Sequence, residues 1–176
     1  MDTVVASDDW HYARSSAREK VLEHLFVGEL LRCFWRRREY DVEVLRAEVD
    51  KGGYDLVLEG NSVIRHVQLK SSHRTAKTAR VDINTALARK PSGCVVWIRF
   101  DPATMELGPF LWFGGEPGSE LPPLGDRVGR HTRADSTGRK GVRSSMRTLR
   151  RGEFQVLADI DAVADKLFGF ESGAGG

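Results

Sequence analysis

Cysteine is scarce in this sequence, since the 176-residue chain contains only Cys33 and Cys94. Two thiols in a chain of this size do not make a disulfide framework. A C-x-x-C pair is also absent, which argues against a structural zinc site. With 40% hydrophobic and 30% charged residues, the chain is apolar enough to fold around a core of its own.

Long apolar runs are missing as well. No segment approaches the ~20 consecutive apolar residues that a membrane-spanning helix needs. The opening MDTVVASDDWHY has neither the basic start nor the apolar stretch of a signal peptide. We therefore expect a cytoplasmic protein without a membrane partner.

A large net charge is lacking too, because the whole chain carries only +2. The distribution is nevertheless uneven. The segment from Arg127 to Arg151 holds nine Lys or Arg residues and a single acid, Asp135. Such a local excess indicates an anionic partner, although a solvated basic loop is the plain alternative.

Hydrophobic periodicity predicts a regular order of elements in the first hundred residues. The expected order is a helix at 15–38, strands at 40–48, 54–59 and 63–70, a helix at 82–90 with Asp82 as a candidate N-cap, and a buried strand at 94–100. A strand at 109–113 follows, then short strands near 128–132 and 145–149, and within 154–168 a final strand and a helix capped near Asp159. A strand, helix and strand in succession favour an α/β arrangement.

Polar side chains gather on one face of the predicted hairpin. Strand residues alternate faces, so Gln68 and Lys70 share a side that Asp55 of the preceding strand can also occupy. Glu29 falls on the apolar stripe of the first helix, where a carboxylate needs a cation or hydrogen-bond donors. The stripe is formed by Leu22, Leu25, Phe26, Leu30, Cys33 and Phe34. A carboxylate, an amide oxygen and an ammonium together suit a hard divalent cation and a phosphate.

The spacing of these residues carries a family resemblance. Asp55 follows Glu29 by 26 residues, Gln68 follows Asp55 by 13, and Lys70 follows Gln68 by two. Over residues 15–100 this combination resembles the PD-(D/E)xK superfamily, the restriction-endonuclease-like nucleases. Its Q-x-K variant is similar to that of Mrr-type nucleases.

The resemblance implies an α/β fold, a restriction-endonuclease-like central mixed β-sheet flanked by helices with an α-β-β-β-α-β core. It implies one nuclease-like domain over residues 1–170. The core would span 15–100 and a basic C-terminal extension 101–170, followed by a flexible tail at 171–176. Many relatives act as dimers, so a homodimer is left open.

The resemblance also implies a metal-dependent nuclease that hydrolyses phosphodiester bonds of DNA, in restriction, repair or mobile-element defence. Asp55 would be the principal carboxylate for Mg²⁺ or Mn²⁺, with Gln68, the Leu69 carbonyl and Glu29 completing the shell. Lys70 would contact the scissile phosphate or the attacking water. Gln68 departs from the motif, which has Asp or Glu there, and a neutral ligand attracts Mg²⁺ less than a carboxylate.

Basic side chains on both sides of the motif are candidates for backbone-phosphate contacts, which bring affinity and salt dependence. They are Arg74, Lys77 and Arg80 after the motif, and Arg133, Arg139, Lys140 and Arg143 in the basic segment.

Plainer interpretations stay open. An Asp after Gly-Gly is usually a turn residue, a Q-x-K strand is usually a solvated face, and Glu29 can lie at the edge of its stripe and reach solvent. The alternative function is a catalytically weakened nuclease-fold module that binds nucleic acid or a protein partner. A third is an interaction subunit whose basic segment docks an acidic protein.

Overall fold

The computed structural model describes residues 15–46, 52–130 and 142–170. Two α-helices, α2 and α3, and nine strands make up this part of the chain. In chain order the elements are α2 (Ser15–Arg37), β1 (Glu43–Arg46), β2 (Leu56–Gly60), β3 (Val63–His73), β4 (Arg80–Asn84), the 3₁₀ turn η1 (Thr85–Arg89), β5 (Gly93–Phe100), β6 (Leu107–Gly114), β7 (Val128–Arg130), β8 (Val142–Arg150), the 3₁₀ turn η2 (Arg151–Glu153), β9 (Gln155–Leu157) and α3 (Ile160–Phe168).

The larger sheet has six strands in the order β1-β2-β3-β5-β6-β9. Only β3 and β5 pair in parallel, and the other neighbours are antiparallel. The prediction of an α/β fold with a central mixed sheet is therefore confirmed. The strands β6 and β9, from the predicted C-terminal extension, belong to this same sheet.

The central strand β5 is buried along its whole length, as its continuous apolar run predicts. Its residues alternate between two cores. Cys94, Val96 and Ile98 pack into the core under α2 and α3. Val95 and Trp97 pack into a second core on the opposite face.

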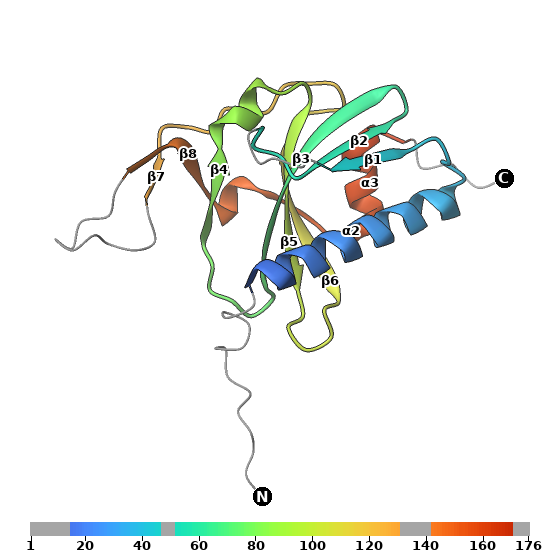
Figure 1. The fold of residues 1–176 in the computed structure, drawn as a ribbon, viewed down its shortest axis with the longest axis horizontal. Helices are drawn as coiled ribbons and strands as arrows, with labels where there is room; N and C mark the ends of the chain where they lie inside the picture. Colours follow the sequence, from blue (N-terminus) through green and yellow to red (C-terminus); the bar gives the residue numbers. More distant parts are fainter. Residues whose placement is uncertain (1–14, 47–51, 131–141, 171–176) are drawn as a thin grey trace, which may run out of the picture.

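A second sheet of three strands, in the order β4-β8-β7, covers that opposite face. Ile83 of β4 and Leu149 of β8 are fully buried there against Trp97. Figure 1 shows α2 (blue) running across the larger sheet, with β4, β8 and β7 to its left. The described chain thus has three layers: helices, a six-stranded sheet and a three-stranded sheet.

The connection from β3 to β5 differs from the prediction. A helix over 82–90 is wrong, because residues 80–84 form β4 and only the short turn η1 follows. Asn84 rather than Asp82 caps η1, since its side chain accepts a hydrogen bond from Ala86 N at 2.9 Å. Ile83 alternates with polar neighbours and pairs opposite Arg147, so pairing with a distant strand overrode the local helical preference.

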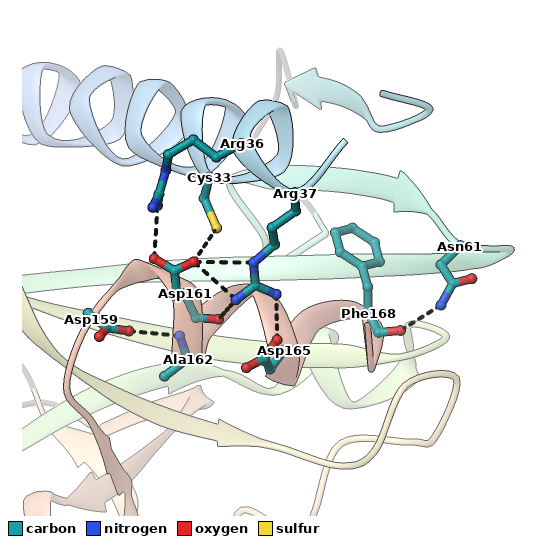
Figure 2. Close-up of polar contacts among 9 residues, drawn as sticks. All are labelled: Cys33, Arg36, Arg37, Asn61, Asp159, Asp161, Ala162, Asp165 and Phe168. Carbon is teal, nitrogen blue, oxygen red and sulfur yellow. Dashed lines mark hydrogen bonds and ion pairs between the residues drawn. The ribbon is translucent and has the colours of Figure 1, made fainter. Parts of the chain in front are cut away.

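The two α-helices are joined at their ends by an arginine (Figure 2). Arg37 Nη1 lies 2.5 Å from Asp165 Oδ1, and its Nη2 lies 3.1 Å from Asp161 Oδ1. Asp161 also accepts hydrogen bonds from Arg36 and from the Cys33 thiol. Asp159 caps α3 by accepting from Ala162 N, as predicted. The contacts of Arg37 with Asp161 and Asp165 hold α3 against the C-terminal end of α2.

No helix in the three described ranges is both long and apolar enough to cross a membrane.

Candidate functional site

Asp55 lies directly before β2, at the end of a tight turn. Gly53 in that turn has φ +72°, and a Cβ there would lie 2.9 Å from the Asn84 side chain, so glycine suits the position. Asp55 N donates to Val67 O at 2.9 Å, and Leu56 pairs with Val67 in the β2–β3 register. Asp55 therefore lies opposite Gln68, as the hairpin prediction requires.

The carboxylate of Asp55 is tied to β3 by a short hydrogen bond. Leu69 N donates to Asp55 Oδ2 at 2.6 Å. Gln68 beside it is buried, and its Oε1 accepts from Asn84 N at 3.3 Å. Gln68 thus connects β3 to the end of β4, where the second sheet begins.

A pocket of about 490 Å³ brings these residues together. Asp55, Gln68, Leu69 and Lys70 all line it, so the structure brings these four residues together at one pocket. The first turns of α2 form the facing wall, and Asn84 and Met146 of the second sheet close another side. The charged side chains that α2 contributes are Arg18, Glu19, Lys20 and Glu23.

Glu29 does not line this pocket, although it was the predicted helix carboxylate. It lies farther along α2, half-buried, and lines a different pocket together with Arg74 and Glu106. Burial raises the pKa of Glu29, while nearby Arg32 opposes this and Glu106 adds to it. The structure supports the alternative in which Glu29 lies at the edge of the stripe.

Glu23 is the carboxylate that α2 buries at the pocket. It is only 7% exposed, its Oε2 lies 2.8 Å from Lys20 Nζ, and its Oε1 lies 3.0 Å from Arg46 Nε. Two cations therefore compensate the buried charge, as physical chemistry requires. Glu19 joins Glu23 in the pocket one helical turn earlier.

The sequence contains a pattern from which Glu23 could have been predicted as the buried carboxylate of the first helix. The predicted stripe included Leu25, which is exposed, and omitted Val27, which is buried. Spacings of four, three and four link four residues that α2 buries: Glu23, Val27, Leu30 and Phe34. Those spacings place Glu23 on the buried face of the helix, whereas Glu19 is exposed.

Lys20 adds a second lysine to the pocket beside Lys70. Its hydrogen bond to Glu23 raises the pKa of Lys20, and the charges of Glu23 and, more weakly, Asp55 raise it further. Lys20 therefore remains protonated and within electrostatic reach of Asp55. The pocket holds acidic and basic groups together, which suits a phosphate ester accompanied by a cation.

The residues predicted to contact phosphate have different surroundings in the structure. Arg74 is held away from the pocket, because its guanidinium donates to Gly108 O at 2.5 Å and to Glu106 at 3.2 Å. Lys77 and Arg80 are exposed, and so is Arg143 on β8. Three further candidates lie outside the described residues, namely Arg133, Arg139 and Lys140.

In the described ranges no three or more His, Cys, Asp or Glu side chains are grouped in a way that could hold a metal ion. The pocket does hold oxygen donors of the kind that Mg²⁺ prefers: the carboxylates of Asp55, Glu19 and Glu23, and the amide of Gln68. The donor types fit a hard cation, provided that the Lys20–Glu23 ion pair opens to admit it.

No protein-family model matches this sequence, and a search of curated proteins gives no match either.

Proposed function

We propose that this protein is a metal-dependent nuclease that hydrolyses phosphodiester bonds of DNA at the pocket between α2 and β3. One observation supports the proposal most. The pocket brings Asp55, Gln68 and Lys70 together and faces them with carboxylates of α2. A carboxylate, an amide oxygen and an ammonium at one pocket suit phosphoryl transfer, in which charge stabilisation and positioning provide most of the catalysis.

Asp55, with Glu23 and Glu19 in place of the predicted Glu29, would hold Mg²⁺ or Mn²⁺ in this proposal. When bound, the metal would polarise the phosphate and lower the pKa of a water molecule. The hydrogen bond from Leu69 N fixes one oxygen of Asp55 in place. Preorganisation of this kind reduces the reorganisation needed during the reaction.

Lys70 would stabilise the negative charge that develops on the phosphate. Its position on β3 follows from the register, in which Lys70 pairs with Trp97 of the buried strand β5. A rigid strand holds a side chain more accurately than a loop does. Lys20 would assist from the facing helix, where Glu23 holds it at 2.8 Å.

The fold family, the cellular compartment and the oligomeric state are also part of this proposal. The parallel β3–β5 pair beside an antiparallel hairpin, with α2 across the sheet, supports a restriction-endonuclease-like arrangement. Free, buried Cys33 and Cys94 suit the reducing cytoplasm. A homodimer stays a prediction, and sedimentation at several protein concentrations tests it.

A second candidate is a module of the same fold that binds nucleic acid or a protein partner without cutting. The existing contacts of two pocket residues favour it. Glu23 is already paired with Lys20 and Arg46, and Gln68 Oε1 already accepts a hydrogen bond from Asn84. These contacts reduce the number of oxygen atoms that are available to a metal ion.

A panel of substrates separates the two candidates. Purified protein is incubated with labelled single-stranded, duplex and branched DNA, in Mg²⁺, in Mn²⁺ and in EDTA, beside Lys70→Met. The nuclease proposal predicts metal-dependent products that the variant fails to form while its melting temperature is unchanged. Salt-sensitive binding without products on any substrate would instead support the binding module.

A further inference from the structure

The outer face of the β4–β8 pair continues from the pocket. Ile83 and Leu149 are fully buried in the second core, so the alternate residues of both strands face away from it. Three pairs of directly opposed residues share this outer face: Arg80 with Arg150, Asp82 with Thr148, and Asn84 with Met146.

One end of this face is part of the pocket, because Asn84 and Met146 line it. The other end carries Arg80 and Arg150. Four residues of strand separate Arg80 from Asn84, which corresponds to about 13 Å. The end near Arg80 is fixed by a backbone hydrogen bond of 2.8 Å from Arg151 N to Ala79 O.

Arg80 and Arg150 form a like-charged pair across two antiparallel strands. Directly opposed residues have Cα atoms about 4.5–5.5 Å apart, and like charges at that position destabilise a sheet. Both side chains are exposed, and no ion pair among the described residues includes either guanidinium. The Glu153 carboxylate accepts a hydrogen bond from Arg150 N at 2.7 Å, but its ion pair is with Arg127. An anion bound between the two guanidinium groups would remove this repulsion.

Asp82 lies between the arginine pair and the pocket, but its carboxylate is engaged. Thr148 Oγ1 donates to Asp82 Oδ1 at 2.7 Å. Strand β7 passes close by, since a Cβ on Gly129 would lie 3.2 Å from Asp82 Oδ2. The negative charge of Asp82 repels an anion placed directly above it, so a phosphate is favoured at the arginine end of this face.

We propose that Arg80 and Arg150 together bind one backbone phosphate of a nucleic-acid strand whose neighbouring nucleotides lie in the pocket. Arginine donors match phosphate oxygens in geometry, and the spacing of the pair lets both groups reach one phosphate. The proposal rests on the proposed function, because the pocket is taken as the place where the strand is cut. It adds the direction in which that strand leaves, along the outer face of β4 and β8.

The test is a binding measurement in EDTA, where no cleavage occurs. Fluorescence anisotropy with a labelled single-stranded DNA and the matching RNA compares wild type with Arg80→Gln/Arg150→Gln over a range of salt concentrations. The charge-matched control is Arg32→Gln/Arg38→Gln, which removes two exposed arginines at the far end of α2. Arg80→Lys/Arg150→Lys keeps both charges.

The proposal predicts that the Gln pair binds about five- to ten-fold more weakly and that its salt slope falls by about one unit. The Lys pair should keep most of the slope, and the α2 control should match wild type. The DNA and RNA arms show which strand is bound. An unchanged slope in the Gln pair, or equal losses in the α2 control, would overturn the proposal even if the protein cuts DNA.

Two other outcomes distinguish failure of the phosphate contact from failure of the proposed nuclease activity. If the Gln pair loses binding but wild type cuts nothing in Mg²⁺, the phosphate contact stands and the proposed activity fails. If wild type binds poly-glutamate but neither nucleic acid, the face serves an acidic protein and the phosphate contact is wrong.

Discussion

Leu69 N donates a hydrogen bond of 2.6 Å to Asp55 Oδ2, which joins the start of β2 to the middle of the Gln68–Lys70 segment. The two residues are neighbours only because the hairpin pairs in the register that places Leu56 opposite Val67. A one-residue slip would turn Gln68 and Lys70 to the other face of the sheet. The position of the candidate site therefore depends on the register of this hairpin.

A second carboxylate at position 68 should strengthen metal binding. In Gln68→Glu, the new side chain can still accept from Asn84 N, and it adds a charge beside Asp55. We expect Mn²⁺ to bind about ten-fold more tightly, as ligand charge governs affinity for hard cations. Isothermal titration measures the affinity.

The matched control for Gln68→Glu is Asn84→Asp, which adds the same charge to another wall of the same pocket. Its side chain can still accept from Ala86 N. Equal tightening in both variants would show a general charge effect rather than a ligand at position 68. In EDTA, Gln68→Glu should unfold more easily, because two carboxylates repel each other, and Mn²⁺ should reverse this.

Two of the three glutamates of α2, Glu23 and Glu29, should differ in function. Glu23→Gln removes a carboxylate that lines the pocket, so we expect cleavage to fall at least about ten-fold. Glu29→Gln changes a residue outside the pocket and should cut as fast as wild type. Initial rates at equal metal concentration decide between them. Loss of cleavage in Glu29→Gln alone would restore the original assignment.

Glu29 also predicts a pH dependence of stability. Burial raises its pKa in the folded protein, so the folded state favours the protonated form. The contribution of Glu29 to stability is then fully present below its unfolded pKa and is lost as the pH rises through the raised value. Urea unfolding should show that Glu29→Gln gains stability at pH 7 relative to pH 4. An equal change at both pH values would contradict this.

The arginine between the helices should contribute to stability. Arg37 is 21% exposed and contacts both Asp161 and Asp165. We expect Arg37→Met to lower the free energy of unfolding by about 1–2 kcal/mol at neutral pH. Arg36→Met should cost less, because the Arg36 side chain is 58% exposed and its ion pair is with Asp161 alone.

Acid should reduce the contribution of this contact. Burial alone would raise the pKa of Asp161, but hydrogen bonds from Arg36, Cys33 and Arg37 outweigh it and lower the pKa. The contribution is therefore present above the unfolded pKa and is lost as the pH falls through the lowered value. The difference between wild type and Arg37→Met should shrink as the pH falls below the ordinary aspartate pKa of about 3.9, as chemical denaturation can measure.

The two thiols should be unreactive in the folded protein. Burial, and for Cys33 a hydrogen bond to Asp161, raises the pKa of Cys33 to about 11, and burial raises that of Cys94 to about 12. The thiolate is the reactive form. We expect labelling by a disulfide reagent at pH 8 to be at least about a hundred-fold slower in native protein than in urea. Rapid labelling of either thiol without urea would show that its surroundings open.

Local patterns in the sequence predicted the parts of the fold that local chemistry decides. The alternation of apolar and polar residues predicted the hairpin that carries Asp55 and Lys70. A continuous apolar run predicted that β5 is buried on both faces. The Asp159 cap and α3 followed from capping preferences. Each of these features depends on neighbours in the chain.

The errors concern contacts between distant segments. β4 forms because it pairs with β8, some sixty residues later, and no local signal in 82–90 shows that partner. The face that α2 buries depends on where β1 places Arg46 beside Glu23. That contact buries Glu23 at the pocket, whereas Glu29 remains at the edge of the apolar stripe.

In the proposed function, Asp55 belongs to a site that cleaves DNA with a metal ion. Asp55→Asn removes the negative charge of this side chain, while its amide oxygen can still accept from Leu69 N. Wild type and variant, purified identically, are assayed on labelled DNA across a Mg²⁺ titration and in EDTA. We predict cleavage by wild type that needs the metal and disappears in Asp55→Asn at an unchanged melting temperature. Equal cleavage by both proteins, or none by wild type on any DNA, would contradict the account.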